Sequence, residues 1–316
     1  MVRGLPDACH PPFGVGRGAN RLTRPDQVRT VVLMSTTVAG TVPLTAGMRR
    51  LLLMATALVT LAGVSLFVFP TRTAEWFAWT VEPPLTAAFL GAAYWASAVV
   101  EATSARARTW ADARVAVPGV LVFTALTLVV TLVHLDRFHL GADVAPATRA
   151  IAAAWVAVYA VVPAVLAVLW LRQRRLPGAD PPRTRPLPTW LRVAVGVMGA
   201  VLLAMGAALL LAPTAAAAAW PWELTPLTGR AIGAWLVGLA VSAAQTVGEN
   251  DARRARPVAA GAVALAVLAA LAVARFPGDL DGVGLPAVAF WLALAAWAAL
   301  GAGILVRGAR PPAGHP

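Results

Sequence analysis

Two charged pairs recur near the ends of apolar runs, and they are the first candidates for chemistry. Glu82 and Arg137 lie in the first half of the chain, and Glu223 and Arg275 lie at matching places in the second half. A charge near a membrane is costly unless it is paired or hydrated. One hypothesis is that each half pairs its glutamate with its arginine at the outer boundary. We favour the alternative, in which all four side chains extend into water, where an exposed pair contributes about 0–1 kcal/mol.

A second candidate is the segment with His134, Asp136 and His139, whose residue types can bind metals. Residues five positions apart on a helix point about 140° from each other, however, and Arg137 adds a repelling charge. The lone Cys9 excludes a disulfide framework and a cysteine-based metal site. The chain also lacks a phosphate-binding glycine loop and a zinc-protease motif. The sequence therefore predicts no catalytic residue, no cofactor and no metal site.

Few polar groups lie inside the apolar runs. Glu101 comes nearest to an intramembrane acid, and we expect it at the inner water boundary near Arg106. Tyr94 and Tyr159 lie deeper, together with threonines whose hydroxyl groups can bond to their own helix. No charged residue falls near the middle of a run, whereas proton-coupled carriers and ion channels usually need such groups. This pattern favours a membrane component that is neither a proton-coupled carrier nor an ion channel.

Tryptophans cluster in two predicted outer loops, at Trp76 and Trp79 in the first half and at Trp220 and Trp222 in the second. Such residues are typical of the interfacial aromatic belt of membrane proteins. The functional alternative is an apolar platform for a lipid or an acyl chain at the outer leaflet. Substitution of Trp79 and Trp222 distinguishes the two, because a belt role changes stability alone.

Small residues recur at four-residue intervals in two of the runs. The stripe in the first half is Ala88, Ala92 and Ala96, and the stripe in the second half is Ala234, Gly238 and Ser242. Small residues spaced in this way let helix backbones approach closely. Alanine is abundant throughout the chain, but the two stripes align with each other. We therefore expect these two helices to meet at the centre, one half against the other.

Membrane-spanning helices must position these residues. Hydrophobic residues make up 59% of the chain and charged residues only 13%, against roughly 25% charged residues in soluble domains. A spanning helix needs about 20 apolar residues, and the uncharged runs are 51–69, 83–100, 115–135, 150–171, 193–222, 231–248, 257–274 and 282–306. The fifth is too long for one helix, and we expect it to end near Pro213. The sequence thus predicts an all-α integral membrane protein with eight transmembrane helices.

The chain repeats itself at a distance of about 140 residues. For example, Asp112-Ala113-Arg114 returns as Asp251-Ala252-Arg253, and a proline follows six residues after each aspartate. Each copy holds four predicted helices, so both copies enter the membrane in the same direction, unlike the inverted repeats of many transporters. We expect two parallel four-helix repeats at residues 48–175 and 189–310, with a Pro- and Arg-rich cytoplasmic linker at 176–188 and a tail at 311–316.

The arginines indicate the orientation, since 21 of the 26 lie on one side of the predicted spans. Cytoplasmic loops attract basic residues, so we expect both termini in the cytoplasm. The same placement explains the net charge of +12 without nucleic acid as a partner. Residues 1–47 have no counterpart in the second copy. We expect them to be a disordered segment, or translation to start at Met34 or Met48 rather than at Met1.

The segments at residues 83–92 (PPLTAAFLGA) and 220–228 (WPWELTPLT) resemble recurring segments of a family of uncharacterised polytopic membrane proteins from G+C-rich, actinobacterial-type bacteria. The resemblance covers residues 48–310. It implies a multi-pass protein of the bacterial plasma membrane. It implies no activity, so it assigns a role to no residue.

Three functions stay open. We favour a non-enzymatic membrane component, whose partners would be the lipid bilayer and either another membrane protein or a second copy of the chain. The second is a carrier for an apolar or weakly polar solute or lipid, which predicts a cavity between the copies lined by Tyr94, Trp95 and Trp235. The third is a lipid-modifying membrane enzyme, which needs carboxylates that converge on one cleft.

Overall fold

The computed structural model describes residues 40–282 and 284–309. Within them, seven helices are long and apolar enough to cross a membrane: α2 (Ala46–Gly63, continued by a π-helical segment at Val64–Val68), α4 (Pro84–Ala105), α7 (Pro146–Arg174), α8 (Thr189–Leu211), α10 (Pro226–Glu249), α11 (Arg256–Arg275) and α12 (Leu285–Ala309). A further apolar helix, α6 (Val117–Val133), has 17 residues. The chain is therefore an all-α, multi-pass membrane protein.

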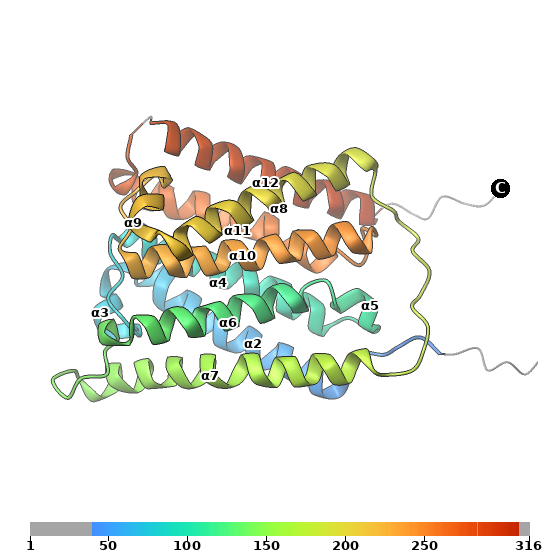
Figure 1. Ribbon diagram of the computed structural model, residues 1–316, viewed down its shortest axis with the longest axis horizontal. Coiled ribbons are helices and arrows are strands. Elements are labelled where there is room, and N and C mark those ends of the chain that lie inside the picture. Colours follow the sequence, from blue (N-terminus) through green and yellow to red (C-terminus); the bar gives the residue numbers. More distant parts are fainter. Residues whose placement is uncertain (1–39, 283, 310–316) are drawn as a thin grey trace, which may run out of the picture. The chain divides into compact units, whose positions relative to one another are not determined.

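Short helices lie in the loops at both ends of the bundle. At one end are α3 (Thr73–Trp76) and α9 (Pro213–Ala216), and at the other is α5 (Trp110–Ala113) (Figure 1). We call the first the glutamate end, because the loops before α4 and α10 carry Glu82 and Glu223 there. We call the second the arginine end, because it carries Arg114 and Arg254.

Proline and threonine mark where the helices begin. A proline in the first turn lacks only an N–H that would have no helical partner there. Pro84, Pro146 and Pro226 occupy such positions at the starts of α4, α7 and α10. Thr45 and Thr225 cap α2 and α10, since each side chain accepts the backbone N–H three residues further on.

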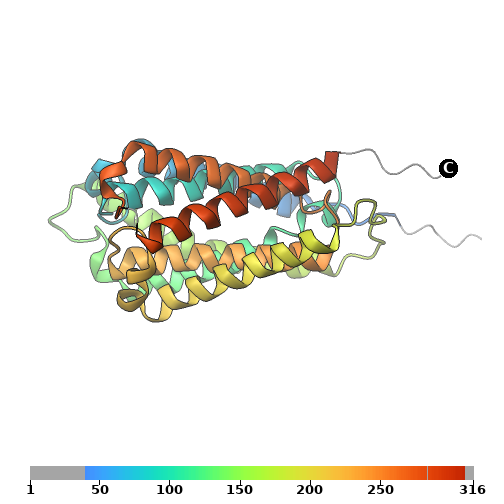
Figure 2. The same ribbon diagram turned by 90° about the horizontal axis from the view of Figure 1, so that it is seen from above.

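The bundle is built around α4 and α10, which have most of their surface buried. Helix α4 packs against α2 and α11, and α10 packs against α8 and α6. The outer neighbours are α6 with α7 and α11 with α12 (Figures 1 and 2). Helices α2, α7, α8 and α12 keep most of their apolar surface exposed. A helix that is apolar on all sides and exposed in this way is typical of a membrane span that faces lipid.

The chain before α2 is tied to the arginine end. The Val42 N–H donates to the carbonyl oxygen of Ala179 at 3.3 Å, and the Gln173 side chain donates to the carbonyl oxygen of Pro43 at 2.9 Å. Residues 40–47 thus contact the rest of the bundle, although they belong to the segment 1–47 for which we expected either disorder or a later translation start. Residues 1–39 and the tail at 311–316 lie outside the described part of the chain.

The linker at residues 176–188 contains no helix and crosses the arginine end in extended form. The Ala252 N–H donates to the carbonyl oxygen of Arg185 at 2.8 Å. The Leu187 N–H donates to the side-chain oxygen of Asn250 at 3.1 Å. These bonds hold the linker against the loop between α10 and α11.

Candidate functional site

Three polar residues of α4 form a buried track at the centre of the bundle. Tyr94, Ser97 and Glu101 are spaced three and four positions apart, so they lie on one face of the helix. The Ser97 hydroxyl donates to Oε1 of Glu101 at 3.2 Å. The Tyr94 and Tyr159 hydroxyl groups are hydrogen-bonded at 2.9 Å, which joins the track to α7.

Glu101 is only 2% exposed, and its Oε2 has no hydrogen-bond partner among the described residues. The sequence led us to expect this carboxyl group in water near Arg106, but Arg106 instead donates to the carbonyl oxygen of Ala102 in its own helix. The end of α4 is covered by a buried apolar cluster that includes Val42 and Trp110. The Glu101 carboxyl group is itself buried, and a buried charge without a partner is costly. The Glu101 carboxyl group must therefore be protonated and neutral, or must bind a partner of its own.

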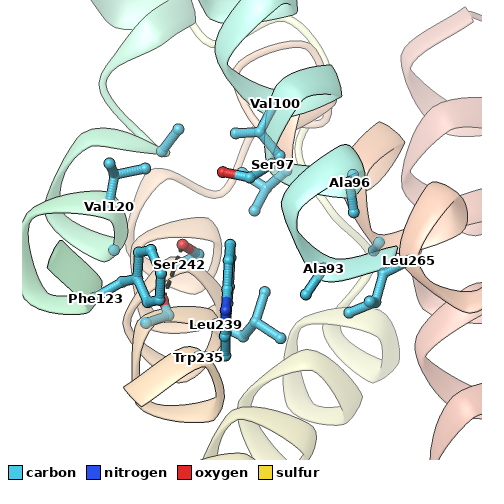
Figure 3. Close-up of a pocket in the computed structure, with 16 residues that line it drawn as sticks. Ala93, Ala96, Ser97, Val100, Val120, Phe123, Trp235, Leu239, Ser242 and Leu265 are labelled. Carbon is cyan, nitrogen blue, oxygen red and sulfur yellow. Dashed lines mark hydrogen bonds between the residues drawn. The ribbon is translucent and has the colours of Figure 1, made fainter. Parts of the chain in front are cut away.

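A small cavity lies beside this track. Helices α4, α6, α10 and α11 surround about 50 Å³, lined mainly by apolar side chains and by the hydroxyl groups of Ser97 and Ser242 (Figure 3). The Trp235 ring stacks on Phe123 with ring centroids 3.9 Å apart, and Tyr94 packs edge-on against Trp235 at 5.1 Å. A cavity of this size with hydroxyl groups can hold water or a small polar group. The aromatic side chains close it toward the glutamate end.

Each end of the bundle has a larger, open cleft. The cleft at the glutamate end measures about 830 Å³, and the side chains of Glu82, Glu223 and Asp281 all line it. The cleft at the arginine end measures about 730 Å³ and is lined by polar residues that include Arg114 and Gln245. Among residues 40–282 and 284–309, the two clefts are separated by a closed, mostly apolar section that contains the carboxyl group of Glu101.

Comparisons with protein-family models, with curated proteins and with solved structures find no match to this chain. Its function must therefore be argued from the geometry of the helices and side chains. The structure supports a multi-pass membrane protein in contact with the lipid bilayer.

The structure does not bring the four recurring charges together in the hypothesised glutamate–arginine pairs. Arg137 is exposed and pairs with Asp136 at 3.2 Å rather than with Glu82. Arg275 donates to the carbonyl oxygen of Phe67 and lies over the Phe67 ring at 5.2 Å rather than beside Glu223. The two glutamates instead share the cleft at the glutamate end. The loops before α4 and α10 direct them there, whereas Arg137 follows α6 and Arg275 is the last residue of α11.

The tryptophans at the glutamate end fold inward. Trp79, Trp220 and Trp222 are buried, and Trp76 alone of the four is half exposed. The Trp222 ring packs edge-on against Phe89 at 5.5 Å, and its N–H donates to the Thr86 hydroxyl at 2.9 Å. An interfacial belt residue would face the lipid headgroups, so three of the four do not have the placement we expected. They form the core beneath the loops instead.

The two stripes of small residues contact other helices more than each other. A Cβ atom on Gly119 of α6 would lie 2.7 Å from the carbonyl oxygen of Gly238, and a Cβ atom on Gly261 of α11 would lie 3.3 Å from that of Ala96. The first stripe, Ala88, Ala92 and Ala96, is fully buried in α4, and the second, Ala234, Gly238 and Ser242, is fully buried in α10. The two helices stand on opposite sides of the small cavity. The small residues therefore allow α6 to approach α10 closely and α11 to approach α4 closely.

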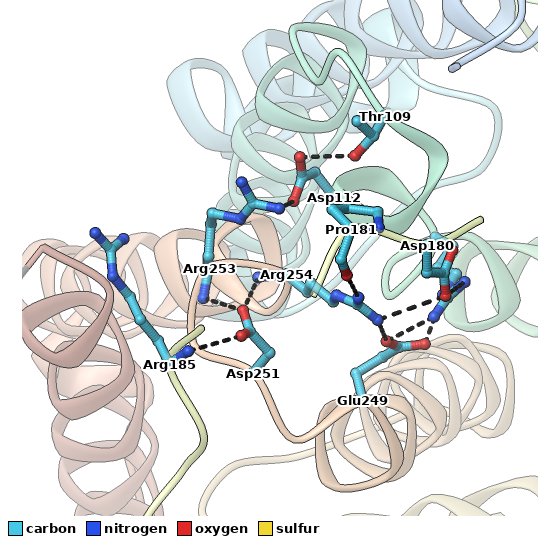
Figure 4. Close-up of polar contacts among 10 residues, drawn as sticks. Thr109, Asp112, Asp180, Pro181, Arg185, Glu249, Asp251, Arg253 and Arg254 are labelled. Carbon is cyan, nitrogen blue, oxygen red and sulfur yellow. Dashed lines mark hydrogen bonds and ion pairs between the residues drawn. The ribbon is translucent and has the colours of Figure 1, made fainter. Parts of the chain in front are cut away.

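The arginine end holds an ion cluster that the sequence did not predict (Figure 4). Arg114 binds Glu249 through two nitrogens, at 2.5 and 2.8 Å, and binds Asp180 at 2.7 Å. Arg254, which is 2% exposed, binds Glu249 at 2.7 Å. Burial lowers the pKa of Arg114, but its bonds to Glu249 and Asp180 outweigh burial and raise that pKa above the ordinary value. The cluster ties the linker to both halves of the chain.

The repeated Asp-Ala-Arg segments were a signal for this cluster. Asp112 of the first pairs with Arg253 of the second at 3.2 Å, and Asp251 accepts the backbone N–H of Arg253 at 3.0 Å and of Arg185 at 2.9 Å. Spacing alone could not show that the two segments face each other.

The histidines at the glutamate end have protein partners. His134 lies 2.8 Å from a guanidinium nitrogen of Arg230, which must donate to it. Burial and the Arg230 charge lower the pKa of His134. His139 bonds to the Phe77 carbonyl oxygen and to the Thr80 hydroxyl, both at 3.0 Å. These bonds explain both histidines as parts of the loop structure.

Proposed function

We propose that the chain crosses a bacterial plasma membrane eight times, as two four-helix repeats that run in the same direction. Helix α6 would be the eighth span, since its 17 residues fall within the range of about 17–25. The contacts support the repeat: α2 packs on α4 as α8 packs on α10, and α4 packs on α11 as α10 packs on α6. Gly91 meets Leu66 and Phe67 of the first copy, and Gly233 likewise meets Leu209 of the second.

The proposed orientation puts the arginine end in the cytoplasm, together with both termini. The arginines that flank the spans support it, because basic residues collect in cytoplasmic loops. A reporter fused after α12 tests this orientation. A fusion that is active only in the cytoplasm is expected, and one that is reached by a membrane-impermeant reagent in intact cells contradicts it.

As a function we propose a carrier that moves a small, weakly polar solute between the two clefts, with Glu101 as its ionisable group. One observation supports this above the others: Glu101 is buried within the bundle, with one oxygen bonded to Ser97 and the other without a partner. Transporters built from repeats bind their substrates near the bilayer midplane between the repeats. Intramembrane acids commonly mark such paths and proton relays.

The proposed mechanism starts from the closed, mostly apolar section between the two clefts. With both clefts open and the centre closed, the structure corresponds to an occluded state. A neutral Glu101 can donate one hydrogen bond to a solute, and it can release its proton once the arginine end admits water. Movement of α4 and α10 against α11 and α6 would open the centre, since these small-residue contacts join the two copies.

The test begins with a thermal-shift screen of the purified protein against short alcohols, amides and phenols. We expect stabilising solutes whose effect is lost in Glu101→Gln and Ser97→Ala. Glu75→Gln is the matched control, because Glu75 is exposed and paired with Arg72 at 3.4 Å. A labelled solute from the screen is then measured in vesicles with an imposed pH gradient. Equal binding and equal uptake by wild type and Glu101→Gln would refute the role of Glu101.

The second candidate is the non-enzymatic component, as a partner subunit or homo-oligomer, and the small size of the central cavity favours it. It predicts that no solute stabilises the protein and that Glu101→Gln changes stability alone. A lipid-modifying enzyme is a third candidate, because Glu82, Glu223 and Asp281 share one cleft. It predicts chemically altered lipid after incubation of the protein in vesicles.

A further inference from the structure

An apolar groove opens between α8 and α12. It measures about 180 Å³ and is lined by side chains that include Met198, Met205, Phe290, Leu294 and Trp297. This exceeds an engineered cavity of roughly 150 Å³ that holds a benzene molecule. The helices beside its mouth expose Val197 and Leu292, which in a membrane would face lipid. The molecules outside the groove are therefore acyl chains rather than water.

The length of the groove matches one leaflet of a bilayer. Its lining begins with Trp220, Pro221 and Pro286 at the glutamate end and reaches Trp297 within α12. Pro286 and Trp297 are eleven residues apart, and a helix covers that distance in about 16 Å. Half of the hydrocarbon core is about 15 Å thick. A chain that enters at the glutamate end therefore reaches the bilayer midplane along this groove.

The glutamate end of the groove carries polar groups suited to a lipid headgroup. Trp220 is 8% exposed, and its indole N–H has no partner among the described residues. Trp220 lines both the groove and the cleft that contains Glu82, Glu223 and Asp281. Trp220 thus stands where the groove meets the cleft, and the three carboxylates in the cleft favour a cationic group there.

In the proposed repeat alignment, residues that line the groove differ in type from their counterparts in the first half. Leu236 and Leu239 line the groove in the second half, and they align with Tyr94 and Ser97, which belong to the polar track. Trp155 packs against Tyr159 in the first half, with ring centroids 4.6 Å apart. The second half therefore has aliphatic residues beside the groove where the first half has members of the polar track.

We propose that this groove binds one acyl chain of an amine-bearing phospholipid, with the ammonium group in the cleft near Glu82, Glu223 and Asp281. The inference does not depend on the carrier function. It uses the proposed orientation only to assign the lipid to the outer leaflet. Phosphatidylethanolamine has the required chemistry, whereas phosphatidylglycerol has the same chains but no amine.

The test is native mass spectrometry of the full chain with equal amounts of phosphatidylethanolamine and phosphatidylglycerol. We expect one retained lipid, predominantly phosphatidylethanolamine. Ala293→Phe places a ring in the groove, and Ala296→Phe is the matched control on the exposed side of α12. Displacement of about two methylene groups should weaken retention about tenfold in Ala293→Phe alone. Equal retention by the two variants would overturn the assignment of the groove.

The headgroup is tested separately with Glu82→Gln/Glu223→Gln. Loss of the two charges should lower the retention of phosphatidylethanolamine and bring its ratio to phosphatidylglycerol close to one, while the retention of phosphatidylglycerol does not fall. A wild-type protein that retains both lipids equally would refute the amine preference. Thermal unfolding of each variant in detergent shows whether it is folded. If Ala293→Phe is unfolded, Ala289→Leu narrows the same groove and takes its place.

Discussion

Glu249→Gln is the sharpest test of the ion cluster at the arginine end. The Glu249 side chain is 12% exposed, and it binds Arg254, whose side chain is 2% exposed, at 2.7 Å. Glutamine keeps the shape and removes the charge, so Arg254 is left buried with Asp180 at 3.6 Å as its nearest carboxylate. Removal of one partner from a buried ion pair costs about 3–5 kcal/mol. Because Asp180 stays near both arginines, we expect the lower end of this range, about 3 kcal/mol.

The assay is unfolding of the purified protein in mixed micelles at a series of denaturing detergent concentrations. Glu75→Gln is the control, since an exposed substitution of this kind should change the unfolding free energy by less than about 0.5 kcal/mol. Arg254→Met combined with Glu249→Gln should cost less than the sum of the single changes, because no buried charge is then left without a partner. A Glu249→Gln protein as stable as Glu75→Gln, or strictly additive costs, would show that the cluster is hydrated and weak.

Two further substitutions probe other contacts. Burial, and then the charge of Arg230, hold the pKa of His134 below its ordinary value, so the neutral ring stabilises the fold fully above about pH 6.5 and less as the pH falls. We expect His134→Gln to flatten the dependence of the melting temperature on pH between about 7 and 5. Gly119→Ala should destabilise by about 1–3 kcal/mol, because its Cβ would lie 2.7 Å from a backbone oxygen of α10. Gly248→Ala meets open space and should stabilise by up to about 1 kcal/mol; a reversed order in a melting experiment would contradict the α6–α10 contact.

The helices could be predicted from the sequence because length and apolar composition determine which segments can span a bilayer. Seven of the predicted runs correspond to long apolar helices, and the run 115–135 corresponds to the shorter α6. The break expected near Pro213 is confirmed, since α8 ends at Leu211 and α9 begins at Pro213. Proline and charged residues mark the ends of helices through their neighbours in the sequence, so these ends can be predicted from the sequence alone.

The faces of the helices could not be predicted in the same way. A helix that is apolar on all sides gives no periodic signal to show which side is buried, so the stripe on α10 did not reveal that α6 would be its partner. Tryptophan serves equally at an interface and in a core, and its place in a loop did not show that Trp222 would fold inward. The burial of Glu101 could not be predicted from α4 alone, because it arises only when other helices pack around α4.

The differences between the halves carry more functional information than their similarity. In the proposed repeat alignment the first half has Tyr94 and Ser97, hydrogen-bonded to Tyr159 and Glu101, whereas the second half has Leu236 and Leu239 beside an open apolar groove. A buried carboxyl group without a partner, such as Glu101, lowers stability. A purely structural role of the duplication therefore does not explain it. We therefore expect the two halves to have different roles. The first half would bind a polar solute at Glu101, and the second half would bind a lipid chain beside Trp220. Substitutions in the groove should then leave the pH dependence of solute uptake unchanged. Glu101→Gln should likewise leave lipid retention unchanged.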